Sequence, residues 1–62
     1  MRFVIYPRRS IRGRRWHWRL RAGNGEIIAT GEAYVNRADC VHAVELVQQS
    51  YAAAVEVRSW AP

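Results

Sequence analysis

Cys40 and His42 are the residues whose types come closest to catalytic chemistry, because a thiol beside an imidazole can form a nucleophile and its base. Their spacing argues against this arrangement. The surrounding segment is expected to be helical, and residues two positions apart on a helix point about 200° apart. The imidazole therefore cannot serve the thiol. We expect Cys40 to lie in the core and His42 to face solvent, where it can pair with Glu45.

The other residues that could take part in catalysis are isolated along the chain. Glu26 and Glu32 have no acid–base partner near them in the sequence. The sequence has no cluster of zinc ligands and no glycine-rich phosphate loop. A single cysteine also excludes an intrachain disulfide. We therefore predict that the protein is not an enzyme, requires no cofactor or metal and takes no small-molecule substrate.

Arginine clustering is the strongest chemical signal in the sequence. The formal net charge is +5, all ten basic residues are arginine, and eight of them precede Glu26, the first acidic residue. Guanidinium groups bind phosphates through paired hydrogen bonds, so the cluster predicts binding to DNA or RNA. An arginine-only composition also fits a GC-rich genome, whereas the clustering does not follow from it. The candidate contact residues are Arg8, Arg9, Arg12, Arg14, Arg15, Arg19 and Arg21.

A protein-interaction or self-assembly module with no nucleic-acid role is the alternative function. A chain of 62 residues forms one domain with a small core, and association adds burial that such a core lacks. Trp60 near the chain end also suggests attachment to something. We therefore expect a homodimer. No apolar run is long enough to span a membrane, and the expected location is cytoplasmic.

Hydrophobic periodicity predicts an α+β fold with the order β-β-β-α-β. The alternation between Trp16 and Arg21 is the clearest strand signal, and Asn24-Gly25 is typical of a hairpin turn. Three strands should form an antiparallel meander with one helix on its apolar face. The expected strands are Phe3–Tyr6, Trp16–Arg21, Glu26–Thr30 and Ala54–Arg58, the helix runs from Arg37 to about Ser50, and Pro7–Arg15 is a basic loop.

The same periodicity assigns the faces of these elements. Trp16, Trp18 and Leu20 should lie under the helix, joined by Phe3 and Ile5 from the first strand. The helix should contact them through Cys40, Ala43, Val44, Val47 and Tyr51. Asn36 is expected to cap the helix N-terminus. The outer sheet face should display Val4, Tyr6, His17, Arg19 and Arg21, as a solvated polar surface, a nucleic-acid platform or a homodimer face.

Residues 16–34 read WHWRLRAGNGEIIATGEAY, which resembles the hallmark hairpin of the YegP-like family of domains of unknown function, WRFRLKAANGEIIASGEGY. Cys40–Val47 and Ala54–Glu56 are similar to the helix and closing strand of that family. The resemblance implies that residues 1–62 form a single small α+β domain. It also implies that two units associate, because the family occurs as single copies or tandem pairs. It brings no catalytic residue, cofactor or ligand.

This chain departs from the family pattern at the residues of greatest chemical interest. The segment from Pro7 to Arg15 is longer than its family counterpart, and all of its charged residues are arginines. Ala33 and His42 stand where glycine and asparagine are common. The resemblance therefore does not explain the arginine cluster.

Overall fold

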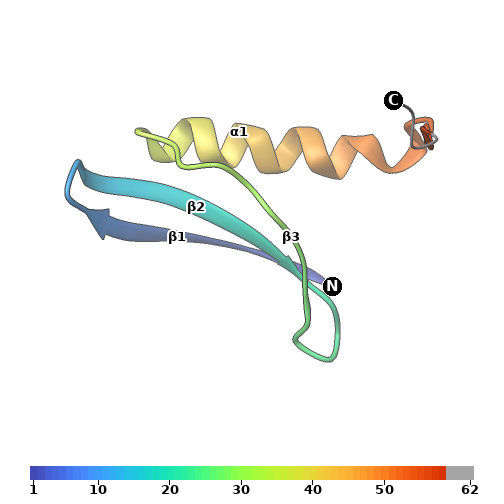
Figure 1. Ribbon diagram of the computed structural model, residues 1–62, viewed down its shortest axis with the longest axis horizontal. Helices are drawn as coiled ribbons and strands as arrows, with labels where there is room; N and C mark the ends of the chain where they lie inside the picture. Colours follow the sequence, from blue (N-terminus) through green and yellow to red (C-terminus); the bar gives the residue numbers. More distant parts are fainter. Residues whose placement is uncertain (59–62) are drawn as a thin grey trace.

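A computed structural model describes residues 1–58, which form one antiparallel sheet and one helix packed on it (Figure 1). The sheet order is β1-β2-β3, and α1 lies along one face. The expected α+β class and three-stranded meander are therefore confirmed. The elements are β1 (Arg2–Ser10), β2 (Gly13–Arg21), β3 (Ile27–Thr30), α1 (Arg37–Gln48) and a 3₁₀ turn (Gln49–Ala52).

The first hairpin is longer than the sequence suggested, and the prediction of a loop over residues 7–15 is wrong. β1 and β2 pair without interruption from Arg2 opposite Arg21 to Ser10 opposite Gly13. The Ser10 hydroxyl accepts a hydrogen bond from the N–H of Arg12 and donates one to the Gly13 carbonyl. Gly13 has a φ of 97°, which a residue with a side chain adopts only with strain. These contacts confine the turn to two residues.

Pro7 suggested the end of a strand, yet β1 continues through it. β1 is an edge strand, and a proline is tolerated there when its missing N–H would have faced outward. The pairing of β1 with β2 places the backbone nitrogen of Pro7 on the outer side of the sheet. Trp16, the partner of Pro7, exchanges both backbone hydrogen bonds with Tyr34 on its other side. Pro7 is therefore not required to donate to β2.

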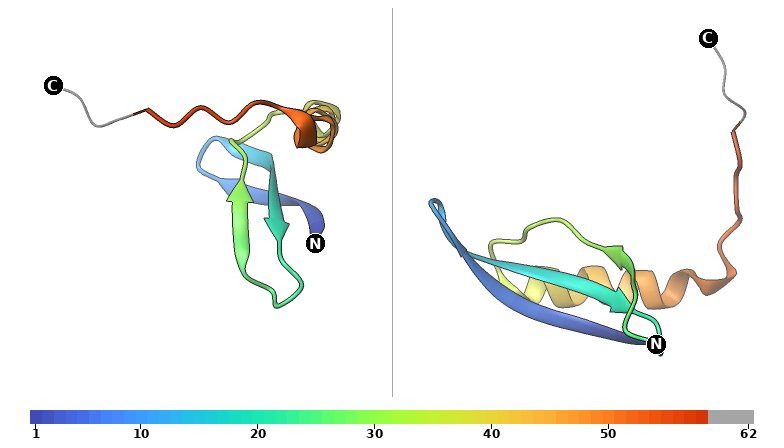
Figure 2. Two further views of the ribbon diagram at one scale, coloured as in Figure 1. Left: turned by 90° about the vertical axis from the view of Figure 1, so that its right-hand side faces the viewer. Right: turned by 60° about the horizontal axis from the view of Figure 1, so that its bottom comes forward.

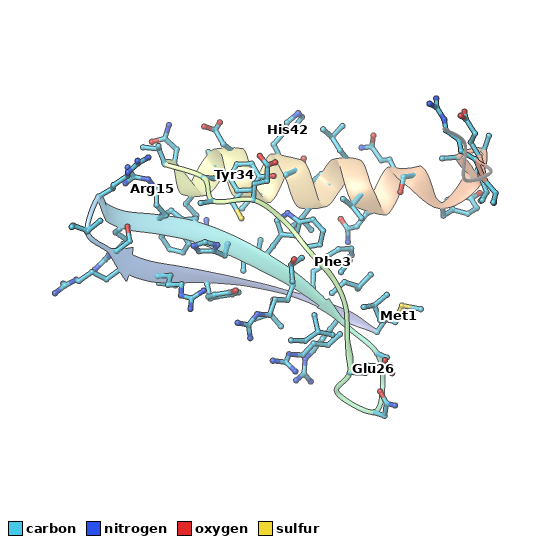
Figure 3. All side chains as sticks on the ribbon, viewed as in Figure 1. Met1, Phe3, Arg15, Glu26, Tyr34 and His42 are labelled. Atoms are coloured by element: carbon cyan, nitrogen blue, oxygen red, sulfur yellow. The ribbon has the colours of Figure 1, made fainter. Side chains whose placement is uncertain are left out.

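The second hairpin and the core match the expected pattern. In the turn, the Ala22 N–H donates to the Glu26 carbonyl over 2.9 Å, and Gly25 has a φ of 86°. Trp18, Cys40 and Val44 form the buried centre of the core. The partly buried hydrophobic residues around it are Phe3, Ile5, Trp16, Leu20, Ala29, Tyr34, Ala43 and Val47. Figure 3 shows Phe3 between the sheet and α1.

The helix begins at Arg37 as expected, but the capping of its N-terminus and the position of its C-terminus differ from the prediction. Asn36 occupies the N-cap position, yet its side-chain amide lies 3.4 Å from the carboxylate of Asp39 and makes no capping hydrogen bond. Tyr51 was expected on the apolar stripe and is 94% exposed. The α-helix ends at Gln48, and the tighter 3₁₀ turn that follows rotates Tyr51 out of the stripe.

The expected closing strand is not formed within this chain. Residues 53–58 continue from the 3₁₀ turn, have no sheet partner and are exposed along their whole length. Figure 2 shows this segment leading away from both the sheet and α1. We call residues 53–58 the C-terminal arm. Trp60, which entered the dimer prediction, lies outside the described residues.

Candidate nucleic-acid interface

The sheet has one uncovered face, and arginine dominates it. Because side chains alternate along a strand, the residues that face away from α1 are out of phase with Trp18 and Ile5. We call this surface the basic face. It comprises Arg2, Val4, Tyr6 and Arg8 of β1 and Arg15, His17, Arg19 and Arg21 of β2.

Tyr6 is the centre of the basic face, and its ring contacts two neighbours on β2. Tyr6 and His17 are cross-strand partners whose rings stack with centroids 5.6 Å apart and planes 19° apart. The Nε of Arg19 donates to the Tyr6 hydroxyl over 2.9 Å, and its guanidinium carbon lies 4.6 Å from the ring centroid. Arg19 is therefore held in one orientation by a hydrogen bond and a cation–π contact.

Beyond Pro7 and Trp16, β1 and β2 continue as a two-stranded ribbon. We call its end, residues 9–14, the hairpin tip; it carries Arg9, Arg12 and Arg14, all exposed. Arg15 lies next to this end of β2 (Figure 3), and its side chain donates to the Arg14 carbonyl over 3.0 Å. The tip is thus a narrow protrusion whose polar groups are mainly guanidinium groups and backbone.

The structure divides the seven predicted contact residues between two surfaces. Arg8, Arg15, Arg19 and Arg21 share the basic face, whereas Arg9, Arg12 and Arg14 lie on the hairpin tip. Three arginine pairs stand directly opposite each other across the strands. They are Arg2 with Arg21, Arg8 with Arg15, and Arg9 with Arg14.

Arg2 belongs to the basic face but was absent from the predicted set. The sequence contained a signal for it, because Arg2 is in phase with Val4 and Tyr6 in a period-two pattern. Arg21, its partner, donates to the Gly25 carbonyl over 2.8 Å and so is anchored to the β2–β3 turn.

Carboxylates do not neutralise these arginines within residues 1–58. The ion pairs in that part of the chain join His42 to Glu45 and Arg58 to Glu56. His42 points away from the sheet (Figure 3), and its Nδ1 lies 4.0 Å from the Glu45 carboxylate, as the helical spacing predicted.

Cys40 lies in the core, as the sequence predicted, and is fully buried. Burial raises the pKa of the Cys40 thiol, and the guanidinium of Arg37 lowers it to a smaller extent. In the described part of the chain, no group of three or more His, Cys, Asp or Glu side chains is placed to hold a metal ion, and no pocket is found. No helix between residues 1 and 58 is both long and apolar enough to cross a bilayer.

Comparison with known proteins identifies the family. Residues 13–57 match the family described as Domain of unknown function (DUF1508). A UPF0339 protein of Treponema denticola is 45% identical over 58 residues, which cover 90% of this chain and 95% of that protein. UPF0339 protein NMB1088 of Neisseria meningitidis serogroup B is 45% identical over 53 residues, covering 86% and 89% of the two chains. The chain therefore belongs to the DUF1508 family of YegP-like domains.

Proposed function

We propose that this domain binds double-helical nucleic acid by contacting phosphates through the basic face and the hairpin tip. The observation that carries the proposal is the set of three cross-strand arginine pairs. Like charges directly opposite each other destabilise an antiparallel pair. A polyanion lying along the hairpin would convert this repulsion into binding energy.

The dimensions of the hairpin suit a duplex. Residues on one face of a strand repeat about every 6.8 Å, and neighbouring strands lie about 4.8 Å apart. A two-stranded ribbon of this kind fits the major groove of DNA, which is about 12 Å wide. Strands are used in this way by known sheet-based DNA-binding proteins. Arg19 and Arg21 are the best candidates for contacts to base edges, because their hydrogen bonds fix their direction.

Aromatic positions favour duplex phosphates over unstacked bases. Single-strand binders stack bases on exposed aromatic rings. Trp18 is buried here and Trp16 packs against the core. The Tyr6 ring already contacts His17 and Arg19. The proposed function is that of a binding module in the cytoplasm that carries out no catalytic step.

The test compares two variants that each remove two positive charges. Arg8→Gln/Arg15→Gln removes one cross-strand pair, and Arg37→Gln/Arg58→Gln removes two arginines outside the sheet. Binding to duplex DNA and to single-stranded RNA is titrated at several salt concentrations around 150 mM. For four to six phosphate contacts on duplex DNA, the slope of log K against log salt should be about −4 to −5.

Arg8→Gln/Arg15→Gln should reduce the magnitude of that slope by about 1.8 and weaken binding to all sequences alike. The control variant should leave the slope unchanged. Equal effects of both variants would mean attraction by net charge alone. Duplex binding weaker than about 100 µM near physiological salt would favour the self-assembly module instead.

A further inference from the structure

Ile11 is an apolar side chain held in water at the far end of the first hairpin. It lies in the turn between the last β1–β2 pair, Ser10 and Gly13, and it is fully exposed. Figure 1 shows this turn beyond the N-terminal end of α1, so the helix does not cover it. A single exposed apolar residue is common on protein surfaces. Two further features of the hairpin tip give this one a specific use.

The first feature is that the turn is held in one shape. The Ser10 hydroxyl accepts from the Arg12 N–H over 3.2 Å and donates to the Gly13 carbonyl over 3.0 Å. Gly13 closes the turn in the left-handed region, with a φ of 97°. A turn fixed in this way has little conformational freedom to lose on binding. Ile11 is therefore presented as a rigid apolar point.

The second feature is that arginines flank Ile11 on both faces of the ribbon. Because side chains alternate along a strand, Arg8 and Arg15 project from the basic face, and Arg9 and Arg14 project from the opposite face. An apolar point between guanidinium groups suits a partner with phosphates at its rim and apolar surfaces between them. A groove of a DNA duplex has this arrangement, because the flat faces of the stacked bases lie behind two rows of phosphates.

The length of β2 determines which groove the turn reaches. Gly13 and Arg19 are six residue steps apart on β2, which is about 20 Å. One turn of the duplex, about 34 Å, contains both grooves, so neighbouring grooves are centred about 17 Å apart. When Arg19 contacts base edges in the major groove, Ile11 therefore lies across one phosphate backbone, at the adjacent minor groove.

We propose that Ile11 is a wedge that enters the minor groove of DNA and separates two neighbouring base pairs, while the arginines of the hairpin tip contact the flanking phosphates. Apolar side chains inserted in this way kink the duplex. The preferred substrate is then DNA that bends readily, above all at pyrimidine–purine steps, which unstack at the lowest cost. This inference rests on the proposed function, because it starts from the basic face docked on the duplex.

Energy transfer between dyes at the two ends of a short DNA duplex tests the proposal, because bending brings the ends closer. One duplex carries a central TA step, and the other carries an A-tract at the same place. The native chain should shorten the end-to-end distance of the TA duplex. It should also bind that duplex about tenfold more tightly than the A-tract duplex, because A-tracts are stiff.

Ile11→Ala removes the wedge and leaves every charge in place. It should reduce the bend and weaken binding to the TA duplex about tenfold, while the dependence of binding on salt stays the same. Ile11→Leu keeps an apolar wedge and should keep the bend. Val35→Ala shortens a valine that is 66% exposed and outside the hairpin, and it should behave as the native chain does. Both positions are exposed, so thermal unfolding should show that all three variants remain folded.

Two results would overturn the wedge and leave the proposed function standing. In one, the TA duplex is bound but stays straight; in the other, Ile11→Ala bends it as much as the native chain does. An absence of duplex binding at 150 mM salt would overturn both proposals. Phosphatidylglycerol vesicles serve as a further probe. Vesicle binding that requires Ile11, with bound DNA left straight, would assign the hairpin tip to a membrane surface and contradict the wedge.

Discussion

Trp18 and Gly31 pack closely against each other. The Gly31 N–H donates to the Trp18 carbonyl over 3.1 Å, while the Gly31 backbone lies against the Trp18 indole. A Cβ on Gly31 would stand 1.8 Å from Trp18 Nε1. Gly31 therefore acts here through its lack of a side chain, which lets the chain after β3 pass close over the core.

Gly31→Ala should destabilise the fold by about 1–3 kcal/mol, because the added methyl group displaces a buried ring. Thermal or chemical unfolding measures the effect. Gly23→Ala is the matched control, since a Cβ there meets nothing within 4 Å. Equal stability of the two variants would mean that the indole can move aside at no cost.

Trp18→Ala should lower the free energy of unfolding by about 3–5 kcal/mol, because it removes the largest side chain at the buried centre of the core. A domain of this size has only about 3–9 kcal/mol of stability in total, so circular dichroism should show a large loss of folded protein. A folded variant with an unchanged melting temperature would contradict the assignment of the helix-facing side of β2.

Cys40 gives the stability a dependence on alkaline pH. Its pKa in the folded state is raised above 9.0 by burial, so the protonated thiol stabilises the fold below that pH. This contribution is lost as the pH rises through the folded-state pKa. Denaturant unfolding below and above pH 9.0 should show a steeper loss for the native sequence than for Cys40→Ala. Parallel pH profiles would show that the thiol ionises equally in both states.

In the first hairpin, the sequence predicts which side of β2 is buried but not where the turn lies. The alternation from Trp16 to Arg21 was sufficient to assign the faces of β2, because one face is buried. Pro7 and Gly13 indicated a loop, and only the register of the hairpin shows that Pro7 lies at an outward-facing edge position. The identity of the arginines was predictable, whereas their division between two surfaces depends on that register.

The prediction of a closing strand at the C-terminal end was wrong for a different reason. The pattern from Ala54 to Arg58 is that of a strand, but a strand requires an edge, and the edge is not encoded in the same residues. Tyr51 followed the α-helical period in the sequence, and the change to a 3₁₀ turn at Gln49 could not be read from that period.

Repulsion between Arg8 and Arg15, which are cross-strand partners, should lower the stability of the domain. In low salt and without nucleic acid, Arg8→Gln/Arg15→Gln should stabilise the domain by about 0.2–1 kcal/mol, because it removes a like-charged cross-strand pair. The gain should diminish at high salt, where exposed charges are screened. A loss of stability instead would indicate that the two side chains support the hairpin by packing.

The single chain is extended for its length. Its radius of gyration is 14.2 Å, whereas a compact domain of this length has a radius of about 10.6 Å. If association supplies the missing burial, the melting temperature should rise with protein concentration. Differential scanning calorimetry over a wide concentration range measures this. A constant melting temperature would indicate that one chain is stable alone.

The outer edge of β1 also matters during protein synthesis, because the elements of the chain are made one after another. Within this chain, β1 is made before its sheet partner β2 and before α1, which packs on it. For that interval, each new chain exposes a strand edge with free backbone groups, and such an edge pairs readily with other chains. An open β1 edge on a nascent chain would thus favour pairing between chains that are made side by side on one messenger RNA.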